Sequence, residues 1–328
     1  MITRSVALAL VVLLLLCCAT ACRQSPTPTG KGLHYSIAIF KIVDHPAINA
    51  MERGFTDYLN RVPEFAGRTT IRVYNAEGSS ANVPLFAGSI ANGRYDLAFV
   101  IGTSCALSLK DKTRTLPIVL GGATDPVGTG LVSSADRPGG NITGTTDLPP
   151  FAKHLLILRR LLPHVRTVGV IYNSVEPNSR LAVAALEKAA KPAGYQVRSI
   201  PVTGQGDINL ALAAAAKRIG VLCLPTDNLV QANIQTVLTA ADRLQLPTFN
   251  CDRASVQNGV LFSVAVDYTD LGILSAKIAV DILVNGTHPA EIPIRALENP
   301  KLYLNGPKLA QFKIGVPEDL ASTAEVLR

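Results

Sequence analysis

Polar side chains that can bind a small charged molecule are concentrated in short loops after apolar runs of the chain. A small molecule that carries both charges needs an acidic group for its cation, and hydroxyl or N–H donors for its anion. The candidate acids are Asp125, Asp227 and Asp267. The candidate donors are the hydroxyls of Ser104, Thr124 and Thr226. These residue types favour a binding site for a small polar ligand.

Aromatic, amide and other polar side chains lie in or beside the same loops. The aromatic candidates for stacking on a ligand are Phe40, Tyr172 and Tyr268, although a tyrosine at a strand end also packs in the interior. The other candidates for ligand contact are His45, Cys105, Glu176, Asn178 and Asn228. His45 precedes Pro46, which favours a role in orienting its loop over a role as a base.

Helix capping and turn formation are competing interpretations of these residues. Ser, Thr and Asp are common N-caps, which is an alternative for Asp227 and Asp267. Asp125 followed by Pro126 also suits a turn. Five such loops at successive strand ends favour binding, since helix N-termini present free N–H groups to carboxylates or phosphates.

Common enzyme and metal-site motifs are absent from the sequence. The chain has no GxSxG elbow, P-loop or HExxH motif, and nothing local supports a triad of His45, Asp125 and Ser104. Its five histidines lack metal-ligand spacing. The cysteines beyond the N-terminal region are odd in number and lack CxxC spacing: Cys105, Cys223 and Cys251. We therefore expect no enzyme activity, cofactor or metal.

Alternating apolar runs and amphipathic stretches predict the elements that position these loops. Buried strands are expected over residues 35–40, 70–74, 97–101, 117–120, 167–172, 195–200, 220–224 and 247–250. Helices are expected after Pro46 and over residues 151–162, 179–193 and 229–244. Two successive units of strands and helices in 328 residues predict an α/β fold of two lobes with parallel sheets. Ligands of such sheets bind beyond the carboxyl ends of the strands.

The N-terminus has the organisation of an export signal. Arg4 precedes an uncharged apolar segment over residues 5–16, which is shorter than the ~20 residues of a membrane-spanning helix. Residues 1–21 are therefore interpreted as a signal peptide, with a short uncleaved anchor as the alternative. Residues 19–22 (Ala-Thr-Ala-Cys) resemble a bacterial lipobox, which implies lipidation of Cys22. Residues 22–34 follow as a flexible tether.

The net charge of +7 does not indicate a nucleic-acid binder. Lys and Arg are scattered along the chain, whereas nucleic-acid binding concentrates positive charge. The densest basic stretch, residues 110–114, is interrupted by an acid and is interpreted as a solvated turn.

The polar loops also carry a family resemblance that runs from about residue 36 to 316. The chain resembles ABC-type substrate-binding lipoproteins of the type I periplasmic-binding-protein fold, a group that includes tryptophan- and tyrosine-type binding proteins. The matching stretches are Ile42–Ala47, Ala123–Gly128, Arg137–Gly144, Val168–Asn173, Glu176–Ser179, Pro225–Asn228 and Val266–Gly272. Cys105 and Cys251 depart from the small residues expected at their positions.

This resemblance implies two Rossmann-like lobes joined by a multi-strand hinge, with the ligand enclosed between them. The first lobe is expected to comprise residues 35–145 and 251–293, and the second 146–250 and 294–328. The implied function is capture of a small molecule, such as an aromatic or other amino acid, for the permease and ATPase of an ABC importer. The protein is expected to be a monomer, lipid-anchored in the bacterial envelope and facing the periplasm or exterior. A ligand-sensing lipoprotein that acts on a signalling receptor is the alternative.

Overall fold

The structure is a computed structural model of the chain, and it describes residues 34–327. Tyr35–Arg328 form a compact unit of their own. The predicted signal peptide, Cys22 and the tether up to residue 33 lie outside the described residues. Within residues 34–327, no helix combines the length and the apolar character needed to cross a membrane.

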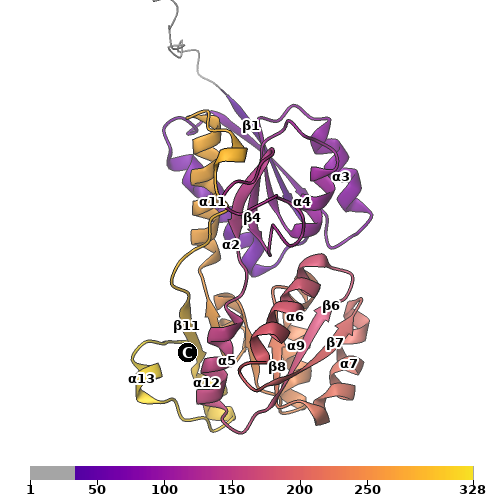
Figure 1. The fold of residues 1–328 in the computed structure, drawn as a ribbon, viewed down its shortest axis with the longest axis vertical. Helices are drawn as coiled ribbons and strands as arrows, with labels where there is room; N and C mark the ends of the chain where they lie inside the picture. Colours follow the sequence, from indigo (N-terminus) through magenta and orange to yellow (C-terminus); the bar gives the residue numbers. More distant parts are fainter. Residues whose placement is uncertain (1–33, 328) are drawn as a thin grey trace, which may run out of the picture. The chain divides into compact units, whose positions relative to one another are not determined.

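A five-stranded parallel sheet in the order β2-β1-β3-β4-β5 forms the first lobe (Figure 1). Its strands are β1 (Tyr35–Lys41), β2 (Thr69–Asn75), β3 (Leu97–Ile101), β4 (Ile118–Ala123) and β5 (Ile142–Thr146). Its helices are α2 (Pro46–Arg61), α3 (Asn82–Ala91), α4 (Thr103–Lys110) and α11 (Tyr268–Leu283). Helix α2 packs against α11, and α3 packs against α4. All five side chains of β3 are buried, as expected for a strand covered on both faces.

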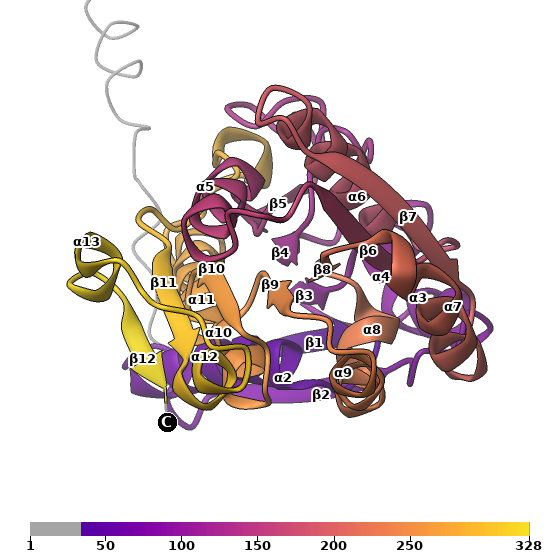
Figure 2. The same ribbon diagram turned by 90° about the horizontal axis from the view of Figure 1, so that it is seen from below.

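A seven-stranded sheet in the order β12-β11-β10-β9-β8-β6-β7 forms the second lobe (Figure 2). Its strands are β6 (Thr167–Asn173), β7 (Gln196–Val202), β8 (Val221–Leu224), β9 (Thr248–Asn250), β10 (Phe262–Ala265), β11 (Lys301–Asn305) and β12 (Glu325–Leu327). Its helices are α5 (Phe151–Leu161), α6 (Pro177–Ala190), α7 (Ile208–Ala215), α8 (Asn228–Ala232), α9 (Ile234–Arg243), α10 (Arg253–Gln257), α12 (Gly306–Gln311) and α13 (Glu318–Ala321). Strands β10 and β11 pair antiparallel, whereas the other pairs are parallel.

The second sheet has a separate hydrophobic core on each face. Val221 and Cys223 of β8 belong to one core, and Leu222 and Leu224 belong to the other. This division follows from strand geometry, because successive side chains point to opposite faces of a sheet. A third core fills the first lobe. The body therefore has its own cores, and a protein that lacks residues 1–22 retains them.

The chain passes between the lobes three times among the described residues. It leaves the first lobe after β5, returns between β10 and α11, and enters the second again before β11. The first and last of these connections are joined by a parallel bridge between Thr145 and Arg295. The return differs from the prediction: it follows Ala265, not Asn250, because β10 pairs with β9 and extends the second sheet.

The helix predicted over residues 229–244 is also different in the structure. It is divided into α8 and α9 at Asn233, which has φ −113° and ψ 27°. The Asn233 side chain donates a hydrogen bond to the carbonyl oxygen of Leu229 (2.9 Å). Asparagine side chains commonly compete with helix backbone bonds in this way. Periodicity alone did not reveal the break because both helices carry apolar residues at helical spacing.

Candidate binding site

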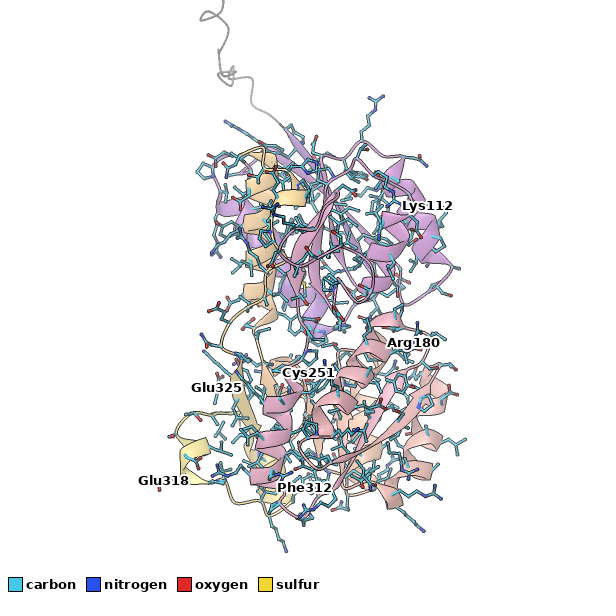
Figure 3. The ribbon with its side chains drawn as sticks, in the orientation of Figure 1. Lys112, Arg180, Cys251, Phe312, Glu318 and Glu325 are labelled. Atoms are coloured by element: carbon cyan, nitrogen blue, oxygen red, sulfur yellow. The ribbon has the colours of Figure 1, made fainter. Side chains whose placement is uncertain are left out.

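A cavity of about 50 Å³ lies between the two lobes. Cys251 lies at the junction of the lobes (Figure 3) and belongs to the cavity wall. The first lobe and its connections contribute His45, Ala47, Ile48, Met51, Ile101, Gly102, Thr103, Gly121, Gly122, Thr124, Asp147 and Tyr268. The second lobe contributes Asn178, Thr226, Asp227, Asn228, Gln231, Cys251 and Asp252. The loops after several strands therefore converge on one site, as α/β topology requires.

The charged side chains of this cavity wall are all acidic. Asp147, Asp227 and Asp252 line it, and no Lys or Arg does so among the residues that the structure describes. This composition contrasts with the net charge of +7 for the whole chain. The cavity wall can therefore stabilise a cationic group on a ligand, such as an ammonium.

Asp147 lies in the connection after β5 and receives two side-chain hydrogen bonds. The Thr124 hydroxyl donates to Oδ1 (3.0 Å), and the Tyr268 hydroxyl donates to Oδ2 (2.9 Å). Loss of hydration nevertheless raises the pKa of the Asp147 carboxyl to about 6, because burial outweighs these hydrogen bonds. A nearby ammonium would favour the ionised carboxylate and lower this pKa.

Asp227 and Asp252 are buried N-caps of short helices in the second lobe. Asp227 accepts from the N–H groups of Val230 (2.8 Å) and Asn173, and Asp252 accepts from that of Ser255 (3.2 Å). Burial, with the neighbouring charge of Glu176, raises the pKa of Asp227 to about 7. Burial also raises the pKa of Asp252. The capping interpretation of Asp227 is therefore compatible with its place in the cavity wall.

Hydrogen-bond donors line the cavity at the start of α4. Thr103, the first residue of this helix, is only 3% exposed. Its hydroxyl has no hydrogen-bond partner among residues 34–327. Gly102 precedes it with φ 113°, a left-handed conformation that favours glycine. The hydroxyl and the free N–H groups of this helix start can together hold a carboxylate.

On the second lobe, Asn178 supplies a hydrogen-bond acceptor that has no partner within the described chain. Its amide nitrogen donates to the carbonyl oxygen of Thr226 (3.0 Å). Its Oδ1 is buried and has no hydrogen-bond partner within the described chain. An unsatisfied buried acceptor is costly, so a donor from a ligand would stabilise this position.

Two direct contacts join the lobes across the cavity. His45 Nε2 lies 3.4 Å from Asn228 Oδ1, and the hydroxyl oxygens of Thr124 and Thr226 are 3.4 Å apart. His45 Nδ1 accepts from the Ile48 N–H (3.4 Å), which leaves Nε2 to donate to Asn228. Burial lowers the pKa of His45 to about 4, so the ring stays neutral at physiological pH.

Some predicted site residues line neighbouring grooves. Ser104 and Glu176 line a groove of about 560 Å³ that shares Asn228 with the central cavity. Glu176 Oε2 accepts from Asn228 Nδ2 (2.7 Å), which connects the groove to the interlobe contact. Asp267 caps α11 through the Thr269 N–H (2.8 Å) and lines a groove of about 500 Å³.

Four other predicted residues lie away from the cavity wall. Phe40 and Cys105 are fully buried in the core of the first lobe, and Tyr172 packs against a core of the second. Asp125 has φ 45° and accepts from the Gly128 N–H (2.9 Å), which is the turn geometry considered for it. The structure thus brings together His45, Thr124, Asn178, Thr226, Asp227, Asn228 and Tyr268, but not these four.

Sequence reasoning missed Thr103, Asp147, Asp252 and Gln231. Asp147 follows β5, whose polar sequence Ile-Thr-Gly-Thr-Thr carries little strand signal. The sequence does contain a signal for Asp252, since Asp is one of the residue types preferred at helix N-caps. No cluster of three or more His, Cys, Asp or Glu side chains suited to a metal ion occurs among residues 34–327.

Comparisons with known proteins agree in family and in fold. The profile of the ABC transporter substrate binding protein family matches residues 36–327. A tyrosine-binding protein of Clostridioides difficile is 30% identical over 271 residues, which cover 82% of this chain and 78% of that protein. A leucine-binding protein from Thermotoga maritima has a TM-score of 0.62 at 12% identity, covers 78% of this chain and 85% of its own, and shares the fold alone.

Two solved structures of similar identity to this chain have different TM-scores. An ABC domain from Streptococcus pneumoniae in complex with L-Trp is 27% identical and has a TM-score of 0.86, with coverage of 90% of this chain and all of that chain. A ligand-free, open substrate-binding protein from Clostridium difficile is 29% identical, with coverage of 90% and 99%, but its TM-score is 0.68.

Proposed function

Because this chain belongs to the ABC transporter substrate-binding protein family, we propose that it captures an amino acid between its lobes and delivers it to an ABC importer. The chain is a substrate-binding protein and not an enzyme. Aromatic amino acids are the first candidates, since relatives are a tyrosine-binding protein and a protein in complex with L-Trp. The proposal also places the protein outside the cytoplasm, held at a membrane by a lipid on Cys22.

The observation that carries this proposal is that hydrogen-bond donors and acidic groups occupy different parts of the cavity wall. The start of α4, with the unpartnered Thr103 hydroxyl, suits the ligand carboxylate. The acidic side of the cavity and the unpartnered Asn178 Oδ1 suit the ammonium. The apolar residues Ala47, Ile48, Met51 and Ile101 provide a surface for an uncharged side chain. Contacts from both lobes would favour the closed arrangement when the ligand is bound.

A thermal-shift screen of the protein lacking residues 1–22 tests this proposal. Natural amino acids, nucleosides and common sugars are compared at equal concentration. A ligand at 100 times its Kd stabilises the folded protein by about 2.7 kcal/mol, which raises the melting temperature measurably. Stabilisation by amino acids, and by aromatic ones above all, is expected. No stabilisation by any amino acid would contradict the proposal.

Thr103→Val then tests the carboxylate position. The variant keeps the shape of the side chain but removes a hydroxyl that has no partner in the described chain, so the fold should be unaffected. Loss of a hydrogen bond to a charged group predicts an affinity roughly ten- to a hundredfold weaker, measured by calorimetry. Ser104→Ala is the matched control: it removes the next hydroxyl along α4, which lines the neighbouring groove. Equal effects of the two variants would argue against a carboxylate at Thr103.

The lipid anchor has a separate test. Cys22→Ser in the full-length chain should abolish incorporation of labelled palmitate and release the protein from the membrane fraction. Cys17→Ser and Cys18→Ser provide controls at the two neighbouring thiols. If Cys22→Ser retained the label and one of the controls lost it, the lipidated residue would be Cys17 or Cys18 and not Cys22.

A further inference from the structure

We propose that Met51 sets the size of the ligand side chain that the closed cavity accepts. Its thioether lies close to Gly121 and Gly122, and rotation of the Met51 side chain enlarges the site for the ring of an aromatic ligand. This inference rests on the proposed function, since it concerns which amino acids bind. It assigns a specificity-determining role to one residue of the cavity wall.

The contact between Met51 and the two glycines is close. Met51 is 2% exposed and lies in α2, where its side chain forms part of the cavity wall. A Cβ atom added to Gly121 would lie 2.7 Å from the Met51 sulfur, and one added to Gly122 would lie 2.8 Å from its terminal methyl carbon. The methionine therefore occupies, together with Phe99 beside Gly121 and Leu271 beside Gly122, the space that side chains at the end of β4 would otherwise fill.

The volume of the cavity makes this side chain decisive. The cavity measures about 50 Å³, whereas an apolar cavity of ~150 Å³ accepts a benzene molecule. An aromatic side chain therefore fits the closed arrangement only if part of the wall moves. The wall near the glycines is strand backbone: Gly121 pairs with Ile101 of β3, and the Gly122 N–H donates to the Thr145 hydroxyl (2.9 Å).

The backbone of α2 is also fixed, so while the lobes stay together this wall gains space by side-chain rotation. A Cβ on Gly272 of α11 would lie 2.1 Å from the Met51 carbonyl oxygen, and one on Gly54 would lie 2.1 Å from that of Thr269. The two helices thus touch backbone to backbone. Methionine has three rotatable side-chain bonds and adapts to irregular space. Ile48 and Ile101, the neighbouring apolar residues, are branched at Cβ and are stiffer.

Two variants of Met51 should change ligand preference in opposite directions. The measured quantity is the ratio of the affinity for tryptophan to the affinity for valine, obtained by calorimetry on the protein lacking residues 1–22. Met51→Ala should raise this ratio by about tenfold, the discrimination that a methylene-sized change in a pocket can produce. Met51→Leu keeps the volume but restricts rotation, so it should lower the ratio and still fold.

Ile90→Ala is the control for a general loss of packing. Ile90 is fully buried in α3 of the same lobe and does not line the cavity. Ile90→Ala should lower the melting temperature without changing the ratio of the affinity for tryptophan to the affinity for valine. A ratio within twofold of wild type in both Met51 variants, while wild type binds amino acids, would overturn the inference and leave the proposed function intact. If the wild-type protein bound no amino acid, both the proposed function and the inference about Met51 would be contradicted.

Discussion

At the scale of single residues, the site combines groups that serve the fold with groups that are free for a ligand. Asp227 and Asp252 cap helices, and Asp147 accepts from Thr124 and Tyr268. The Thr103 hydroxyl and Asn178 Oδ1 have no partners within the described residues. The acids can therefore supply negative charge to a ligand ammonium when they are ionised, while the unpartnered atoms offer new hydrogen bonds.

Ligand capture should depend on pH because two carboxyls of the cavity wall titrate near neutrality. The folded-state pKa values of Asp147 and Asp227, about 6 and about 7, are both raised. Their contribution to folding stability is thus fully present below the unfolded pKa and is lost as pH rises through 6 to 7. An ammonium ligand favours the ionised carboxylates, so its affinity should rise with pH, by about tenfold or more between pH 5.5 and 7.5.

Calorimetry in buffers with different ionisation enthalpies measures the protons released on binding. Release is expected near pH 6 to 7 and should decrease in Asp147→Asn. His45, with a pKa of about 4, is neutral throughout this range and contributes no protons. Burial also raises the pKa of Asp252 in the same wall, and the Tyr268 hydroxyl stays protonated because burial raises its pKa. Binding without proton release would place the ammonium away from these acids.

At the scale of elements, the contact between α2 and α11 holds one wall of the site in place. Gly54→Ala should destabilise the protein, because the new Cβ would lie 2.1 Å from the Thr269 carbonyl oxygen and would push the helices apart. Overpacking typically costs about 1–3 kcal/mol, which exceeds the gain in helix propensity of about 1 kcal/mol. Urea unfolding measures the difference.

Gly88→Ala provides the matched control within another helix. Gly88 lies in α3, and an added Cβ would meet nothing within 4 Å. This variant should stabilise the protein by up to about 1 kcal/mol through helix propensity and reduced freedom of the unfolded chain. Equal changes in both variants would contradict the close-contact explanation.

The elements with strong apolar patterns could be predicted from the sequence, whereas polar or short ones could not. Leu97–Ile101 was predicted with its observed bounds because every residue in it is apolar, and every side chain is buried. β5 was missed because threonine and glycine dominate it, and Asp147 at its end was missed with it. The positions of Phe40 and Cys105 in the core depend on which face of a strand or helix points inward, and loop position alone does not determine this.

At the scale of the whole molecule, the lobes meet across the cavity through a small number of direct side-chain contacts. Two side-chain contacts, His45 with Asn228 and Thr124 with Thr226, cross the cavity at 3.4 Å. Long contacts of this kind stabilise closure only weakly, so the lobes should separate readily. Ligand-dependent closure therefore needs only a modest difference in affinity between the open and closed forms.

The thiol of Cys251 can report chemically on the separation of the two lobes. Its thiol lines the cavity and is 6% exposed, while Cys105 and Cys223 are fully buried within single lobes. Burial raises the pKa of all three thiols, so reaction with a maleimide should be slow in the closed form. In the protein lacking residues 1–22, Cys251 should react first, at a rate set by how often the lobes part. Saturating amino acid should slow that reaction, and mass spectrometry of the modified peptides would then measure opening without any introduced probe.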